Sequence, residues 1–199
     1  MLFVEAAHAS SDDRIIAAIA ALIDSLSAEW ETHADIARAG ASIDACLRAC
    51  DGAIVPSLIQ RAVDELERVV AIAYQPGGAS IGVAENVRLA SALLTAFGLT
   101  ARLPYAMLAE ELVQTIRRSR WESAAGLFTA PTDVNCEAAR VLSRLRDLHR
   151  NAEYRAAAVL APGADYDADA AGILEALAPE IDHEGFPCAA YGLALLEHA

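Results

Sequence analysis

The chain has 199 residues, of which 55% are hydrophobic, and this is enough to bury a sizeable core in one large or two small domains. Its formal net charge is −13, so we expect neither a nucleic-acid partner nor an anionic membrane surface. All fifteen basic residues are arginine, which excludes Schiff-base and P-loop lysine chemistry.

The first 75 residues predict a series of helices with one apolar face each. Apolar side chains recur at helical spacing, and a Ser-Asp-Asp sequence supplies start signals for the first helix. The predicted helices span residues 11–38, with a stop at Gly40, then 42–50 and 56–74. Pro76 and the glycine pair that follows it predict a loop over residues 75–80. Residues 1–75 therefore form an N-terminal helical segment.

A duplicated pattern runs from Asn86 to Ala158. Moving the sequence by 49 residues places Asn86 on Asn135 and Tyr105 on Tyr154, and no gap is needed. Each copy contains an asparagine, an Ala- and Leu-rich helix, a short polar turn, a tyrosine and a second helix. A repeat of about 50 residues with two helices is typical of an α-helical array or toroid.

The predicted fold is all-α, because no segment shows the period-two alternation of a strand. Further helices are predicted at residues 81–99 and 105–121, from Asp133 through the second copy, and at 170–177 and 187–198. Residues 76–199 thus form tandem antiparallel helical hairpins, continuous with residues 1–75, in an open arc or a partial (α/α) toroid. The second copy is expected to be more exposed, because its outer side carries four arginines. They are Arg140, Arg144, Arg146 and Arg150.

The first copy, from Asn86 through Tyr105 to Glu111, and the second copy, from Pro131 to Tyr154, resemble a recurrent hairpin of known toroids. These are the (α/α) toroids of bacterial proteins with an N-terminal thioredoxin-like domain, which are relatives of the N-acylglucosamine 2-epimerases. The resemblance covers residues 80–198 and implies part of a toroid, because the length holds fewer hairpins than a closed ring needs. We find neither the thioredoxin-like domain nor its cysteine pair in these residues. The epimerase histidines find no match, so the resemblance transfers no catalytic residue.

A polar stripe on the returning helix of the first copy is a candidate ligand-binding surface. It comprises Glu110, Gln114, Arg117 and Trp121. In a toroid such a stripe can line the central cavity, with the tryptophan stacked on a sugar ring; the alternative is a solvated outer face that ends in a packed tryptophan. Asp147 and His149 lie two residues apart near the second turn. Together with Glu110 they are candidate acid–base residues, and the alternative is a surface hydrogen-bonding pair.

The cysteines and a run of alternating acids are the only candidates for a metal site. Cys46 and Cys50 lie four apart on one helix and can be combined with His33 and Cys136, but buried core thiols are the favoured interpretation. The acids within residues 165–169 lack the glycine and the terminal glutamate of a calcium loop, and they fit a helix N-terminus instead. We therefore expect no metal and no cofactor.

Three functions remain open at this point. The first is a non-catalytic or auxiliary helical-repeat domain that binds a protein partner or a small molecule on its concave face. The second is a toroid-class enzyme that acts on a carbohydrate, with Glu110 and Asp147 as acid–base groups. The third is a subunit of a homo-oligomer that completes its core by association. The first residues lack the basic region of a signal peptide, and no apolar run reaches the ~18 residues of a membrane helix, so we expect a cytoplasmic protein without membrane contact.

Overall fold

The computed structural model describes residues 13–30, 35–51, 56–73, 81–158, 163–181 and 185–199, and this part of the chain is almost entirely helical. Its α-helices are α2 (Asp13–Ala28), α3 (Ile36–Asp51), α4 (Ile59–Ala73), α5 (Val83–Thr100), α6 (Leu103–Arg120), α7 (Thr132–Arg150), α8 (Ala152–Ala157), α9 (Tyr166–Leu177) and α10 (Phe186–His198). Short 3-10 helices, η2 (Pro56–Leu58) and η3 (Ala178–Glu180), precede α4 and follow α9. The predicted all-α fold is confirmed. Among the described helices, none combines the length and the apolar character needed to cross a bilayer.

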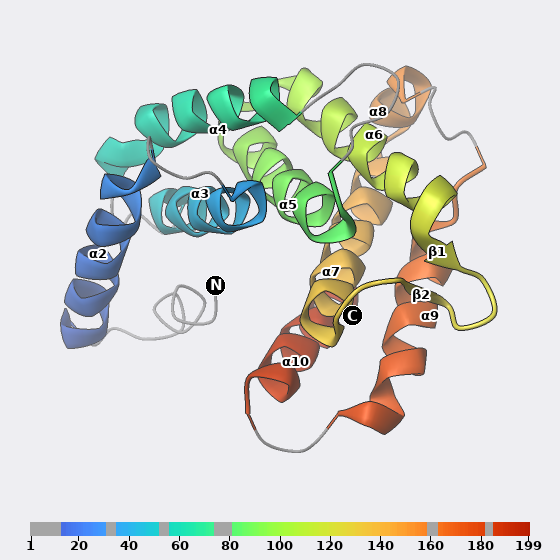
Figure 1. Cartoon of the computed structure of the whole chain (residues 1–199). Coiled ribbons are helices and arrows are strands. Elements are labelled where there is room, and N and C mark those ends of the chain that lie inside the picture. The colour runs from blue at the N-terminus through green and yellow to red at the C-terminus, as the bar shows by residue number, and fades with distance from the viewer. Residues whose placement is uncertain (1–12, 31–34, 52–55, 74–80, 159–162, 182–184) are drawn as a thin grey trace.

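The helices form an arc of two layers, which Figure 1 shows. Helices α4, α6 and α9 lie on the outside, and α3, α5 and α7 lie on the inside. Along the inner layer α3 packs on α5, α5 packs on α7, and α10 continues the row against α7. One connected core of buried apolar side chains extends from Ile19 in α2 to Ala194 in α10. The inner layer therefore brings helices that are far apart in sequence into direct contact.

A small antiparallel strand pair corrects the prediction that the chain contains no strand. Strands β1 (Trp121–Glu122) and β2 (Leu127–Phe128) pair in the link between α6 and α7. The chain reverses between them through Gly126, whose φ of +69° lies in the left-handed region that favours glycine. Two residues per strand are too few to produce an alternating pattern, so this pair leaves no periodic signal in the sequence.

The predicted helix stop at Gly40 is also wrong, because α3 runs through this residue. A Cβ atom at Gly40 would lie 3.2 Å from the backbone of Arg88 and 3.2 Å from that of Leu89, both in α5. The glycine therefore permits two inner helices to approach closely, which is a packing role within a helix. The helix begins earlier than predicted, where the Asp35 carboxylate accepts a hydrogen bond from the Arg38 N–H at 3.0 Å.

The two asparagines of the duplicated pattern share two contacts through Nδ2, and Asn135 in addition exchanges hydrogen bonds with the backbone of Phe128. Asn86 Nδ2 donates to the carbonyls five and four residues before it, at 3.1 and 2.8 Å. Asn135 Nδ2 donates to the carbonyls at the same two offsets, at 2.9 and 3.3 Å. The second halves of the copies differ, since α6 has 18 residues and α8 has 6. The 49-residue duplication stays a prediction, with these matching helix starts in its favour.

The arginines of α7 are less exposed than the sequence predicts. Arg140 is 6% exposed, the side chain of Arg146 is 12% exposed, and Arg144 is half-buried, whereas the Arg150 side chain is 70% exposed. The expectation of an exposed outer side is wrong for the first three, because neighbouring helices supply polar partners for them. The predicted loop at residues 75–80 lies outside the described residues, and so does His33.

Candidate functional site

A cavity of about 740 Å³ lies among the inner helices, with walls from α2, α3, α5, α7 and α10. Most of the wall is apolar, and Leu26, Ala45, Phe186 and Leu193 contribute to it from three different helices. This volume falls within the range of about 300–1,000 Å³ that is usual for small-molecule sites. The residues that line the cavity come from helices far apart in the sequence, from α2 to α10.

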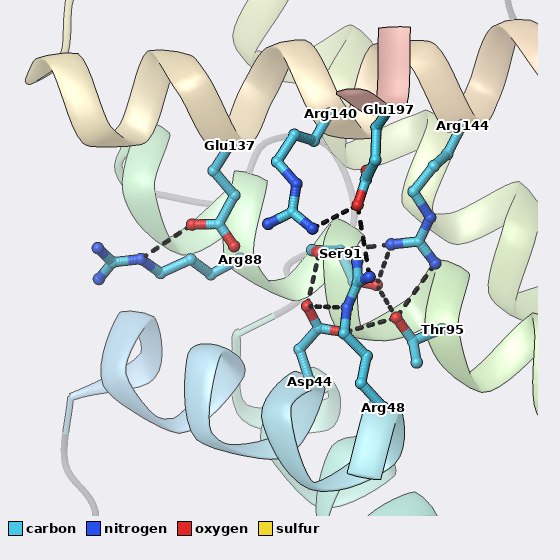
Figure 2. A network of polar contacts seen from close by, with 9 residues as sticks. All are labelled: Asp44, Arg48, Arg88, Ser91, Thr95, Glu137, Arg140, Arg144 and Glu197. Carbon is cyan, nitrogen blue, oxygen red and sulfur yellow. Dashed lines mark hydrogen bonds and ion pairs between the residues drawn. The ribbon is translucent and has the colours of Figure 1, made fainter. Parts of the chain in front are cut away.

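Charged side chains from α5 and α7 form one end of this cavity. Asp133, Glu137 and Arg140 lie on a single face of α7, because helix positions four and seven residues apart project in similar directions. Arg88 of α5 faces them, with its Nη2 3.4 Å from Asp133 Oδ2 and its Nε 3.5 Å from Glu137 Oε2. Arg140 Nη2 donates to Glu197 of α10 (Figure 2). The Nε of Arg140 is shielded from solvent and makes no hydrogen bond with the residues that the structure describes.

A buried carboxylate lies beside this charged end, at the contact of α3 and α5. Asp44 is 1% exposed and accepts hydrogen bonds from the hydroxyls of Ser91, at 2.8 Å, and Thr95 (Figure 2). Burial by itself raises the pKa of Asp44, but Arg48 and Arg144, together with the two hydroxyls, lower it to about 2. Asp44 is therefore ionised at neutral pH although it is inside the protein.

Arg144 connects this carboxylate to α7. Its Nη1 donates to the Ser91 carbonyl at 3.2 Å, and its Nη2 donates to the Thr95 hydroxyl at 3.1 Å. Burial, and then the nearby Arg48, lower the pKa of Arg144 to about 10, so it remains charged at neutral pH. Polar contacts thus join α3, α5, α7 and α10 directly next to the cavity (Figure 2).

Glu137 differs from Asp44 in the direction of its pKa shift. Burial, and then the negative charge of Asp44, raise the pKa of Glu137, while Arg88 and Arg140 oppose the rise. The contact with Arg88, at 3.5 Å, is too long to compensate fully for lost hydration. The pKa of Glu137 is therefore shifted upward, opposite to that of Asp44.

Three of the residues predicted from sequence meet in a separate cluster between α6, α7, α8 and α9. Glu110 is 0% exposed, and its carboxylate lies 2.8 Å from His149 Nε2 and accepts from the hydroxyls of Tyr154 and Tyr166 at 3.1 and 2.6 Å. Gln114 Nε2 donates to the Tyr166 hydroxyl at 2.9 Å. Burial, and then Glu110, raise the pKa of both tyrosines, so both hydroxyls stay protonated as donors. The Glu110 carboxylate is thus held by three groups of the protein itself.

The other predicted site residues lie apart from this cluster. Arg117 Nε lies 2.7 Å from the Asp169 carboxylate, and Trp121 packs edge-on against Phe128 with ring centroids 4.9 Å apart. Asp147 forms ion pairs with two arginines of its own helix, at 2.9 and 3.0 Å. The polar stripe of α6 therefore does not converge on a single site, and none of its residues lines the cavity described above.

The three cysteines considered for a metal site are buried. Cys46 and Cys136 are 0% exposed and Cys50 is 7% exposed. Burial raises the pKa of Cys46 to about 12 and that of Cys136 to about 11, so neither forms a thiolate at neutral pH. Cys136 belongs to the cavity wall, where its neutral thiol behaves as a small apolar group.

Sequence reasoning did not identify the charged end of the cavity, although a signal was present. The charged residues of α7 recur at spacings of four and three, which place them on one face of a helix. They are Asp133, Glu137, Arg140 and Arg144. A charged stripe usually faces solvent, so only the packing of α3, α5 and α10 against it reveals a buried site. Comparison of the chain with protein-family models, with curated proteins and with solved structures yields no match.

Proposed function

We propose that the protein binds a small, mostly apolar molecule in the cavity between α2, α3, α5, α7 and α10. The observation that carries this proposal is the cavity itself, with a volume of about 740 Å³ and walls that are mainly apolar. A largely apolar pocket with a few convergent polar groups is the usual form of a small-molecule site. The cavity belongs to the inner layer, so the proposal corresponds to ligand binding on the concave face of an arc.

Carbohydrate chemistry at Glu110 has weaker support than ligand binding in the cavity. Glu110 is fully buried, and its carboxylate already interacts with His149, Tyr154 and Tyr166. A general acid or base must reach the proton that it transfers, either directly or through one water molecule. Asp147, the second acid of the enzymatic hypothesis, makes its ion pairs elsewhere. The contacts of the cluster instead join α6, α7, α8 and α9.

A neutral fluorescent probe tests the proposal without any assumption about charge. We expect N-phenyl-1-naphthylamine to bind in a saturable manner, at one site per chain, with increased emission from an apolar site. Replacing Ala190 of the cavity wall by phenylalanine fills part of the volume, so Ala190→Phe should weaken binding about tenfold or more. The matched control is Ala168→Phe, at an exposed position of α9.

Two results would overturn the proposal. One is that the wild-type protein shows no saturable binding of the probe. The other is that Ala190→Phe binds as tightly as Ala168→Phe while far-UV circular dichroism shows both variants to be folded. Either result would mean that the cavity is a packing defect or a solvent-filled cleft. In the first case nothing binds, and in the second case the probe binds equally well when the cavity is partly filled.

A further inference from the structure

We propose that the ligand of the cavity is an apolar carboxylate, that Arg88 and Arg140 bind its carboxylate group, and that Glu137 yields this place by taking up a proton. The inference rests on the proposed function and specifies the class of ligand. It concerns the charged end of the cavity, where α5 and α7 face each other. The apolar walls then hold the hydrocarbon part of the same molecule.

The first support is the surplus of hydrogen-bond donors on Arg140. This side chain is nine-tenths buried, at 6% exposure, and it lines the cavity. A guanidinium has five N–H donors, and within the described part of the chain Arg140 donates from Nη2 to Glu197 alone. Its Nε is shielded from solvent and has no acceptor among the described residues. The terminal nitrogen of Arg140 that does not contact Glu197 lies on the side of Glu137 in Figure 2, so it is the donor that a ligand oxygen would meet.

Arg88 supplies a second set of donors from the opposite helix. Its two ion-pair distances, 3.4 Å to Asp133 and 3.5 Å to Glu137, are at the long end for hydrogen bonds. Its side chain is 25% exposed, which leaves room for the guanidinium to reorient. A carboxylate can accept from two guanidinium groups at once, because its oxygens offer about four lone pairs.

The place for the ligand's carboxylate is indicated by the protein's own carboxylate. Figure 2 shows Glu137 between the guanidinium groups of Arg88 and Arg140. The charged groups around it are Arg38 and Asp44 of α3, Arg88 of α5, Asp133 and Arg140 of α7, and Glu197 of α10. The carboxylate of Glu137 occupies the position between the two arginines, so it competes with a ligand's carboxylate for their donors.

Two carboxylates in this place repel each other unless one is neutral. Protonation of Glu137 removes its charge and weakens its ion pair with Arg88, so that the ligand's carboxylate can accept from both Arg88 and Arg140. The balance is one ligand anion and one proton from solvent taken up together. Burial and the charge of Asp44 raise the pKa of Glu137, and a second carboxylate beside it would raise this pKa further. Affinity for a carboxylate should therefore fall as the pH rises above this raised pKa.

Isothermal titration calorimetry with decanoate and decanol as paired probes tests the inference. The wild-type protein should bind decanoate at least about tenfold more tightly than decanol at pH 6, with a smaller preference at pH 8. Titrations in buffers with different ionisation enthalpies should show proton uptake with decanoate and none with decanol. Arg88→Gln should weaken decanoate binding by about 10- to 100-fold and leave decanol binding unchanged. The control is Arg120→Gln, since Arg120 is exposed at the end of α6.

The Glu137→Gln variant separates the role of the proton from that of the arginines. Its side chain is neutral at every pH, so it should bind decanoate as tightly at pH 8 as at pH 6 and without proton uptake. Equal affinity of the wild-type protein for decanoate and decanol would overturn the choice of a carboxylate, while the proposed function would stand. Absence of binding by both probes and by the neutral fluorophore would overturn the proposed function itself. Unchanged proton uptake in Glu137→Gln would overturn the role of Glu137 alone.

Discussion

At the scale of single residues, the inner layer depends on a carboxylate that is kept charged inside the protein. Asp44 is 1% exposed, and its partners come from α3, α5 and α7. Removing one member of a buried ion pair is strongly unfavourable, because the charge that remains has lost its compensation. Arg48 and Arg144 are the charges that would remain. The network therefore affects stability mainly because removal of one member leaves a buried charge without compensation.

Replacing Asp44 by asparagine should lower the free energy of unfolding by about 3 kcal/mol at pH 7. The pKa of Asp44 is lowered from 3.8 to about 2 in the folded protein. Its contribution is therefore present above pH ~4 and is lost as the pH falls from there toward 2, a loss of roughly 2 kcal/mol that Asp44→Asn should not show. Urea unfolding at pH 7, 4 and 2.5 measures both effects.

Asp147→Asn provides the matched control for this prediction. Asp147 also forms ion pairs with two arginines, but its side chain is 50% exposed. Exposed pairs contribute about 0–1 kcal/mol, so this variant should stay close to the wild-type protein. The prediction fails if the two variants lose similar stability, or if Asp44→Asn retains the full decrease in stability between pH 4 and 2.5.

At the residue scale, three of the polar side chains selected from the sequence lie together in the structure, whereas the rest of the predicted set lies elsewhere. Glu110 and Gln114 are on one helix, and His149 joins them, so three polar residues selected from the sequence do lie together. Tyr166, which connects to both Glu110 and Gln114, was not foreseen. Tyr166 lies on α9. Its position against α6 depends on how these two helices pack, and no periodicity in the sequence relates them.

At the scale of elements, the helices follow from abundant alanine and leucine at helical spacing, and the errors occur at glycines. The sequence predicts a helix stop at Gly40, but this residue lies within α3. A glycine inside a helix lowers helix propensity, so the reason for Gly40 at this position is found in the neighbouring helix. Helix α5 approaches Gly40 so closely that a side chain has little room. The sequence of α3 alone does not contain this information.

Alanine substitutions at two helical glycines should therefore change stability in opposite directions. Gly98 of α5 has nothing within 4 Å of the position of an added Cβ, so Gly98→Ala should stabilise the protein by about 0.5–1 kcal/mol. At Gly40 an added Cβ lies 3.2 Å from backbone atoms of Arg88 and Leu89. Separating two packed helices costs about 1–3 kcal/mol, which exceeds the gain in helix propensity.

Thermal unfolding followed by circular dichroism at 222 nm measures this pair of variants, since about 1 kcal/mol shifts Tm by roughly 2–4 °C in a protein of this size. We expect a higher Tm for Gly98→Ala and a lower Tm for Gly40→Ala. A rise of Tm in both variants would show that α3 and α5 separate easily. The close contact at Gly40 would then not be a constraint on the arc.

At the scale of the whole molecule, the contacts connect the two segments into which the sequence was divided. Residues 1–75 were predicted to form an N-terminal segment and residues 76–199 a repeat region, continuous with each other. Asp44 of the first segment accepts hydrogen bonds from Ser91 and Thr95 of the second. The core cluster likewise includes buried side chains from both segments. These contacts favour a single cooperative unit, and a domain division would require few contacts across the boundary.

The two tryptophans of the chain allow this expectation to be measured, because one lies in each segment. Trp30 is 1% exposed and donates to the Ser42 hydroxyl at 3.0 Å, whereas Trp121 packs edge-on against Phe128. Trp121→Phe leaves Trp30 as the only tryptophan, and Trp30→Phe leaves Trp121. In each variant, urea unfolding should give the same midpoint by fluorescence and by circular dichroism, since a two-state transition gives the same curve with every probe. Comparison within each variant removes the effect of the substitution on stability. If the fluorescence midpoint of either tryptophan differs from the circular dichroism midpoint of the same variant, the segments unfold separately, and the contacts of Asp44 do not unite them.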